Sequence, residues 1–235
     1  ETQFHDIEID PGVILYLTAN SYIKISGEVF KGSNAQISSL SAAANTIEYN
    51  GTSTSQNIII PNDINPRYHN LILSGSGNKI IPSVDLSIYG NLTVTGAVTV
   101  NLPSINLNVF GNFMVDSGTT FAAGTSTINM AGISGQKIGG TKTSLSLYNL
   151  TNTNTTDTVK VNIPSLSLGG NLTNNGVLDF ETNILTGING TLANSGTIRT
   201  ANTTASPLPT AKTWSVVSGG NTLGTVEYSG VAAQT

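Results

Sequence analysis

A short phrase recurs along this chain at intervals of about 20 residues. Gly90-Asn91-Leu92 returns as Gly111-Asn112-Phe113 and again as Gly170-Asn171-Leu172, and Gly176-Val177-Leu178 returns as Gly196-Thr197-Ile198. A unit this short cannot bury its own apolar face, so such units stack on their neighbours. The repeat therefore predicts a stack of similar short units.

A longer period overlies the first. Three phrases share a pattern and are each followed by a glutamine: Thr-Ile-Glu-Tyr-Asn-Gly at 46–51 with Gln56, Thr-Ile-Asn-Met-Ala-Gly at 127–132 with Gln136, and Thr-Val-Glu-Tyr-Ser-Gly at 225–230 with Gln234. Their starts lie 81 and 98 residues apart. On this basis the super-repeats are roughly 1–110 and 111–223, with a third beginning at 224. We expect residues 1–235 to form one continuous segment and to be a fragment of a longer array.

The local pattern indicates strands. Apolar and polar residues alternate in short runs such as 86–88, 92–94 and 105–109, and glycine, asparagine or proline interrupts them every few residues. No sustained 3.6-residue period competes with this strand-turn-strand pattern. We therefore predict an all-β fold, a right-handed parallel β-helix (β-solenoid) with rungs of about 20 residues. Asparagine and glycine suit its corners because they tolerate left-handed backbone, and stacked asparagines can form hydrogen-bonded ladders.

An alternative architecture is a row of tandem β-sandwich domains. Each would hold about 80 to 100 residues, which the longer period also fits. The strands of a sandwich have no reason to resemble one another at the spacing of the shorter period, so that period favours the β-helix. In a β-helix, Leu92, Phe113 and Leu172 are expected to occupy equivalent inward positions in different rungs.

The composition excludes several classes of protein. Only 9% of the residues are charged, and the nine Lys and Arg are outnumbered by thirteen Asp and Glu, so no basic face for nucleic acid is expected. No apolar run approaches the roughly 20 residues of a membrane-spanning helix. The absence of cysteine fits either a reducing cytosol or export without disulfides. The low charge and the abundant Thr, Asn and Ser favour export.

These phrases resemble the tandem-repeat regions of giant cell-surface and secreted adhesins of Bacteroidetes bacteria. Residues 46–56, 68–79, 90–96 and 170–178 carry the resemblance, which covers nearly the whole chain and is weakest at 200–223, around Pro207, Pro209 and Trp214. It implies β-solenoid repeats like those of gliding adhesins, type IX secretion, an extracellular or cell-surface location, and a role in adhesion or gliding motility. It supplies no catalytic residues.

Few residues are candidates for chemistry. Asp179 and Glu181 are two residues apart, so on a strand they would share one face, and a carboxylate pair can cleave glycosides by acid and base catalysis. The simpler interpretation is a solvated strand face. Asp6, Glu8 and Asp10 also alternate, and their oxygens could bind Ca²⁺. The alternative is an acidic edge that discourages further strand pairing. We expect no other cofactor.

Other motifs are weaker. His5 and His69 lie in different units and could bind a metal only if the fold joined them. Thr93 and Thr95 form the Thr-x-Thr pattern of ice-binding solenoids, but the pattern does not recur. Asp157-Thr158-Val159 resembles the O-glycosylation signal of exported Bacteroidetes proteins, which makes Thr158 a glycosylation candidate. No Gly-x-Ser-x-Gly motif or cysteine nucleophile is present.

Together these features predict a non-catalytic structural or adhesive repeat segment of a large exported surface protein, acting as a stalk or an adhesion surface. Its expected partners are other repeats of the same chain, stacked end to end, and surface glycans or host and abiotic surfaces, but not nucleic acid. The alternative is a carbohydrate-active β-helix, either a polysaccharide lyase or glycosidase or a phage tail-spike protein.

Overall fold

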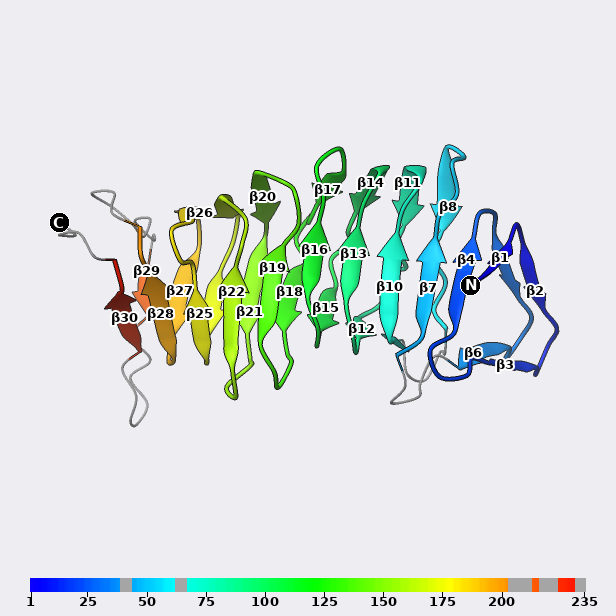
Figure 1. Ribbon diagram of the computed structural model, residues 1–235, viewed down its shortest axis with the longest axis horizontal. Coiled ribbons are helices and arrows are strands. Elements are labelled where there is room, and N and C mark those ends of the chain that lie inside the picture. Colours follow the sequence, from blue (N-terminus) through cyan, green and yellow to red (C-terminus); the bar gives the residue numbers. More distant parts are fainter. Residues whose placement is uncertain (39–43, 62–66, 203–212, 216–223, 231–235) are drawn as a thin grey trace.

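A computed structural model describes residues 1–38, 44–61, 67–202, 213–215 and 224–230. These residues form parallel strands and no helix. Where a strand pairs with a later one, it pairs with the third strand after it in the sequence, as β1 does with β4. The exceptions are at the C-terminal end, where β27 pairs with β29 and β28 pairs with β30. The result is a parallel β-helix drawn out into a rod (Figure 1), and the predicted fold class is confirmed. Gln234, Pro207 and Pro209 lie outside the described residues.

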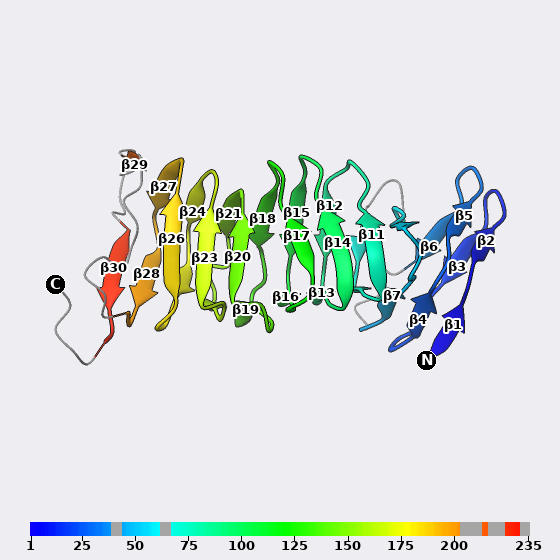
Figure 2. The ribbon, with the colours of Figure 1, turned by 90° about the horizontal axis from the view of Figure 1, so that it is seen from above.

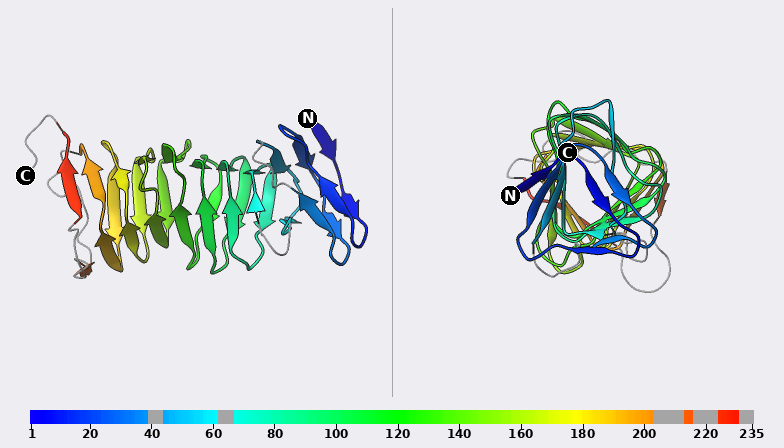
Figure 3. Two further views of the ribbon diagram at one scale, coloured as in Figure 1. Left: turned by 90° about the horizontal axis from the view of Figure 1, so that it is seen from below. Right: turned by 90° about the vertical axis from the view of Figure 1, so that its right-hand side faces the viewer.

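Three faces surround the core, as the end view in Figure 3 shows. Face 1 is the eleven-stranded sheet that runs the length of the rod. Its strands are β1 (Thr2–Phe4), β4 (Tyr22–Ile25), β7 (Thr46–Tyr49), β10 (Asn70–Leu73), β13 (Leu92–Val94), β16 (Phe113–Val115), β19 (Gln136–Gly139), β22 (Thr158–Val161), β25 (Val177–Asp179), β28 (Thr197–Thr200) and β30 (Thr225–Tyr228).

Faces 2 and 3 are interrupted sheets. Face 2 consists of β2 (Ile7–Ile9) and β5 (Val29–Lys31); then β8 (Ser55–Asn57), β11 (Ser76–Ile80), β14 (Ala97–Asn101) and β17 (Thr120–Ala122); then β20 (Ser144–Leu147), β23 (Ser165–Leu168) and β26 (Ile184–Ile188). Face 3 consists of β3 (Ile14–Tyr16) and β6 (Gln36–Ser38); then β9 (Arg67–Tyr68), β12 (Leu86–Ile88), β15 (Asn106–Val109), β18 (Thr127–Met130), β21 (Asn149–Asn152), β24 (Leu172–Asn174), β27 (Thr191–Asn194) and β29 (Thr213–Ser215).

Columns of Ile, Leu, Val and Phe fill the interior. Leu92 lies opposite Phe113 on face 1, and both side chains are buried. Leu172 is also buried, but it belongs to face 3, where it lies between Leu150 and Leu192. The expectation that Leu172 is equivalent to the other two residues is therefore wrong. The third residue of each Gly-Asn-Leu or Gly-Asn-Phe phrase begins a strand, and that strand is on face 1 in two copies and on face 3 in the third.

The Gly-Asn phrase makes the corners of the coil. The side-chain oxygen of Asn91 accepts the backbone N–H of Asn112 one rung later at 2.8 Å, and Asn70 does the same for Asn91 at 2.9 Å. A Cβ on Gly111 would lie 2.7 Å from this Asn91 oxygen, and one on Gly90 would lie 2.3 Å from that of Asn70. Glycine is thus required where the asparagine of the preceding rung passes, and the predicted asparagine ladder is confirmed.

The glutamine of the longer repeat is buried at a corner. Gln136 accepts the Gly132 N–H at 2.9 Å through Oε1, while its Nε2 donates to the carbonyls of Val109 and Gly111 at 2.9 and 2.7 Å. Gln56 makes the equivalent three bonds. The two copies serve different corners, however, because Gln56 lies on face 2 and Gln136 on face 1. The longer repeat therefore specifies a type of corner rather than a position around the coil.

Among the strands that the structure describes, the pairing between rungs is interrupted at two places along the rod. Neither β5 with β8 nor β6 with β9 is paired, and Figure 2 shows the first two rungs, β1 to β6, tilted from the rest of the stack. Further along, β17 and β20 are adjacent on face 2 but unpaired. At that point the residue number of paired positions on face 1 rises by 25 (138 − 113), against 21 in the rung before (113 − 92). This second break creates the hollow described below.

Candidate functional site

A row of charged residues crosses face 1 toward the C-terminal end of the rod. Lys160, Asp179, Arg199 and Glu227 lie in register on the successive strands β22, β25, β28 and β30. Arg199 contacts Asp179 at 3.5 Å and Glu227 at 3.0 Å. Its hydrogen bond to Glu227 is the main cause that raises the pKa of Arg199. Opposite charges thus alternate along this row, which is favourable for cross-strand neighbours.

Of the predicted carboxylate pair, Asp179 lies in this row and Glu181 lies in the turn beside it. Asp179 ends β25, and Glu181 follows it with a left-handed backbone (φ 49°) and an N–H that donates to Asp179 Oδ1 at 2.8 Å. The Glu181 carboxylate accepts a 2.7 Å bond from Lys160, and this bond is the main cause that raises the lysine pKa. Each carboxylate therefore contacts a cation from another rung. Sequence reasoning missed these cations because the register between rungs was unknown.

The calcium candidates Asp6, Glu8 and Asp10 line one hollow near the N-terminal end of the rod, but they do not form a metal site. Asp6 accepts the Glu28 N–H at 2.7 Å, which is the main cause that lowers its pKa, and its contact with His5 at 3.0 Å lowers it further. Glu8 lies on β2 opposite Phe30, and Asp10 follows that strand. Among the residues that the structure describes, no three His, Cys, Asp or Glu side chains converge as metal ligands.

The two histidines are also far apart. His5 follows β1 and His69 precedes β10, so they lie at opposite ends of face 1 strands with β4 and β7 between them. The structure therefore does not assemble the histidine pair. Thr93 lies between Ile72 and Met114 on face 1, so its hydroxyl belongs to no threonine row. Thr158, the glycosylation candidate, begins β22 and is partly exposed.

A second polar cluster, which the sequence did not reveal, lies near the N-terminal end of face 1. The Glu48 carboxylate accepts hydrogen bonds from Tyr22 and Ser74, and it is 3.7 Å from Lys24, which also contacts Glu1 at 2.9 Å. Burial, followed by the hydrogen bond to Glu48, raises the pKa of Tyr22. These contacts join side chains of neighbouring rungs, as the charged row does at the other end.

A buried lysine, which the sequence did not reveal either, lies on face 2 with its side chain directed into the core. Lys79 is 1% exposed, and its Nζ donates to the Gly51 carbonyl and to Gln56 Oε1, both at 2.8 Å. Burial lowers its pKa to about 8. Asn154 donates to Gln136 Oε1 at 3.2 Å in the other copy of the corner. Lys79 thus donates to the glutamine oxygen at one corner, as the Asn154 amide does at the other, which indicates a structural role for the lysine.

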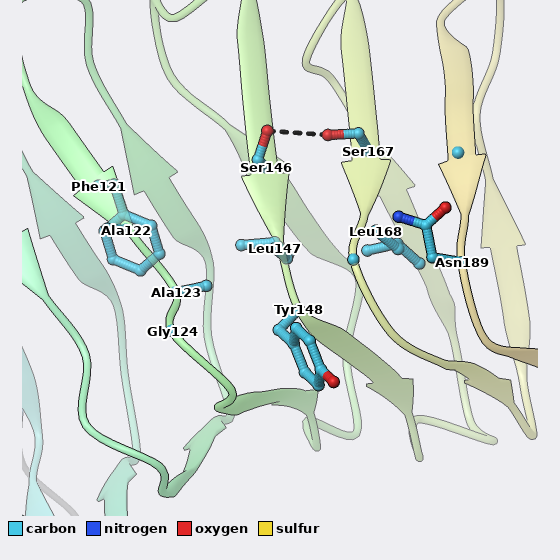
Figure 4. A pocket seen from close by; sticks show the side chains of 12 residues that line it. Phe121, Ala122, Ala123, Gly124, Ser146, Leu147, Tyr148, Ser167, Leu168 and Asn189 are labelled. Atoms are coloured by element: carbon cyan, nitrogen blue, oxygen red, sulfur yellow. Dashed lines mark hydrogen bonds between the residues drawn. The ribbon is translucent and has the colours of Figure 1, made fainter.

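A hollow in the surface lies at the break between β17 and β20 (Figure 4), and we call it the face 2 groove. It has a volume of about 500 Å³, within the range of small-molecule sites. Its lining consists of Phe121, Ala122, Ala123, Gly124, Ser146, Leu147, Tyr148, Ser167, Leu168, Gly169, Gly187 and Asn189. Among these residues none is charged. The interruption of strand pairing leaves room here that a continuous sheet would fill.

Small side chains deepen the face 2 groove. Ser146, Ser167 and Gly187 succeed one another on β20, β23 and β26, and the two serine hydroxyls are 2.8 Å apart. A Cβ on Gly187 would meet no atom within 4 Å. The Tyr148 ring lies beside the glycine pair of the next rung, where a Cβ on Gly170 would be 2.9 Å from it. The groove therefore combines hydroxyl groups with an exposed aromatic ring.

Comparison with known proteins adds no relative. No protein-family model matches the chain, and neither a curated protein nor a solved structure is significantly similar to it. Within the described ranges there is no helix of the length and apolar character that crossing a bilayer requires.

Proposed function

We propose that the chain is a non-catalytic structural and adhesive segment of a large exported surface protein, where it serves as a stalk or an adhesion surface. One observation carries the proposal: the polar side chains bond from rung to rung. Asn91 and Asn171 bind the backbone of the next rung. Lys160 and Arg199 bind carboxylates of neighbouring rungs. This use of polar groups supports a load-bearing rod rather than a catalytic centre.

The interior supports the same proposal. Buried apolar residues run through the rod in a single cluster, from Ile9 to Ile198. In such an array each rung contacts only its neighbours, so stability is approximately a sum of rung and interface contributions. Adding rungs to an array of this kind increases the distance between its two ends without changing the structure of each rung. Export by the type IX route and display at the cell surface remain part of the proposal, and they rest on the resemblance of the repeats.

Bead adhesion tests this function. Beads carrying the purified chain would be passed over glycan-coated, host-cell and polystyrene surfaces under flow, beside beads carrying an unrelated acidic protein. The proposal predicts that the chain retains beads on at least one surface at shear stresses that remove the control beads. Equal retention of both kinds of bead on every surface would contradict an adhesive role.

A carbohydrate-active β-helix is the second candidate, and the feature that favours it is the neighbouring carboxylates Asp179 and Glu181. Two carboxylates and two cationic side chains are in contact here across neighbouring rungs: Glu181 with Lys160, and Asp179 with Arg199. The backbone of Glu181 is in the left-handed region, where strain often accompanies function. Turnover of a polysaccharide that is lost in both Asp179→Asn and Glu181→Gln would establish this candidate.

A further inference from the structure

We propose that the face 2 groove binds a neutral saccharide, with Tyr148 as the platform for the sugar ring. This inference rests on the proposed adhesive function and names the ligand class for one of its surfaces. The groove opens where β17 and β20 fail to pair, and its residues come from the successive strands β17, β20, β23 and β26 and the turns that follow them. An oligosaccharide could therefore lie along the rod across several rungs.

The Tyr148 ring suits one face of a sugar. It is 37% exposed, and its side toward the next rung packs beside Gly169 and Gly170, whose missing side chains leave room for it. The ring is thus held in place by backbone while remaining accessible from the groove. Pyranose rings present a face of C–H groups, and an aromatic side chain offers such a face a large apolar surface next to a polar hydroxyl.

The polar groups of the groove match sugar hydroxyls. Ser146 and Ser167 can each donate and accept a hydrogen bond, as can the amide of Asn189. Asn189 is exposed, and its described hydrogen bond is from its backbone N–H to the Leu168 carbonyl. Figure 4 shows the Asn189 amide beside Leu168, and the Tyr148 ring below Leu147. Because both residues line the groove, an oligosaccharide that lies along the rod can contact the ring in one rung and the amide in another.

Charge determines the choice among ligands. The lining residues include no Lys or Arg to pair with a carboxylate, sulfate or phosphate, and no Asp or Glu to pair with a cation. A neutral saccharide matches this environment, whereas an acidic glycan would lose hydration without gaining an ion pair. An extended peptide could instead pair with the open strand edges, but β17 has only three residues, Thr120–Ala122, to offer it.

The test begins with an array of neutral oligosaccharides, acidic oligosaccharides and extended peptides, followed by calorimetric titration of the saccharide that binds best. We expect Tyr148→Ala to weaken binding at least about tenfold through loss of the stacked ring, and Tyr148→Phe to stay within about threefold. Gly187→Leu should block the groove without disturbing the core, since a Cβ there meets nothing within 4 Å. Tyr89→Ala is the matched control, because Tyr89 is 47% exposed and stacks on Phe110 away from the groove.

Three results would overturn the inference: no neutral saccharide on the array binds, acidic glycans or peptides bind in its place, or both Tyr148→Ala and Gly187→Leu bind the saccharide as well as the native chain. Bead adhesion separates this inference from the proposed function. Beads that adhere while no saccharide binds would reject the groove alone. Saccharide binding without bead retention on any surface would reject the adhesive function and leave the groove standing.

Discussion

The side-chain oxygen of Asn91 caps the backbone N–H of Asn112 in the next rung at 2.8 Å. Asn149 caps Asn171 in the same way, also at 2.8 Å. These bonds satisfy corner N–H groups that no strand partner reaches. The recurring asparagine thus has a structural role that requires no ligand.

Removing one of these caps should weaken the rod by a small amount. Asn91→Ala leaves the Asn112 N–H to solvent, and we expect a loss of about 1 kcal/mol in the free energy of unfolding. Asn91→Asp keeps an oxygen acceptor and should lose less. Urea unfolding followed by circular dichroism measures both. An unchanged midpoint in Asn91→Ala would show that the ladder contributes nothing to stability.

Two glycines should respond differently to the same substitution. A Cβ on Gly111 would lie 2.4 Å from the Gly90 carbonyl oxygen, so Gly111→Ala forces the rungs apart and should cost about 1–3 kcal/mol. Gly187→Ala is the control, because its Cβ would meet no atom within 4 Å and alanine restricts the unfolded chain. Thermal unfolding of both variants compares them. Equal midpoints would contradict the explanation of the Gly-Asn corner.

The buried glutamine should be more sensitive than its neighbour. Gln136→Leu leaves the Gly132 N–H and the carbonyls of Val109 and Gly111 without their partner, at a cost of about 1–3 kcal/mol for each group that stays buried. Lys137→Met changes the adjacent exposed side chain and should have little effect. Chemical unfolding of the two variants measures the difference. Similar stabilities would mean that water replaces the amide and that the corner does not depend on it.

Lys79 should make stability depend on alkaline pH. Its pKa is about 8 in the fold against the ordinary lysine value of 10.5, so between these values the unfolded chain binds more protons and stability rises with pH. The contribution is fully present above about pH 10.5 and is lost as pH falls through about 8. Relative to Lys79→Met, the native chain should gain on the order of 3 kcal/mol across this window.

Comparison with Lys79→Met also removes a competing effect. Burial raises the pKa of Tyr49 to about 12 and that of Tyr68 as well, so both tyrosines oppose the rise above about pH 10, but equally in the two proteins. Unfolding curves at half-unit pH steps provide the comparison. A pH-independent difference between the two proteins would show that Lys79 titrates normally in the fold.

The repeat was sufficient to predict the coil but not the position of each residue around it. Leu92 and Leu172 follow identical Gly-Asn pairs, yet they lie on different faces. The reason is that rung length varies: the rung from Phe113 to Ile138 is longer than the rung from Leu92 to Phe113. A corner motif responds only to its local backbone and to the rung beneath it, so the motif alone cannot fix the register.

The candidate sites were harder to predict for the same reason. Asp179 and Glu181 were visible as a pair, but their partners Arg199 and Lys160 come from other rungs, a full turn of the coil away in the sequence. The face 2 groove depends on the failure of β17 and β20 to pair, which no motif records. The rung from Phe113 to Ile138 is longer than the one before it, but this length is known only from the strand register.

The proposed function requires the chain to bind a surface without cleaving the polysaccharides on it. Its most direct test is incubation of the purified chain with plant, algal and bacterial polysaccharides, with reducing ends and unsaturated products measured over a day alongside the polysaccharide retained by the protein. We predict retention of at least one neutral polysaccharide and no product above the level of a heat-denatured sample. Product formation by the native chain that disappears in Asp179→Asn or Glu181→Gln would contradict the account.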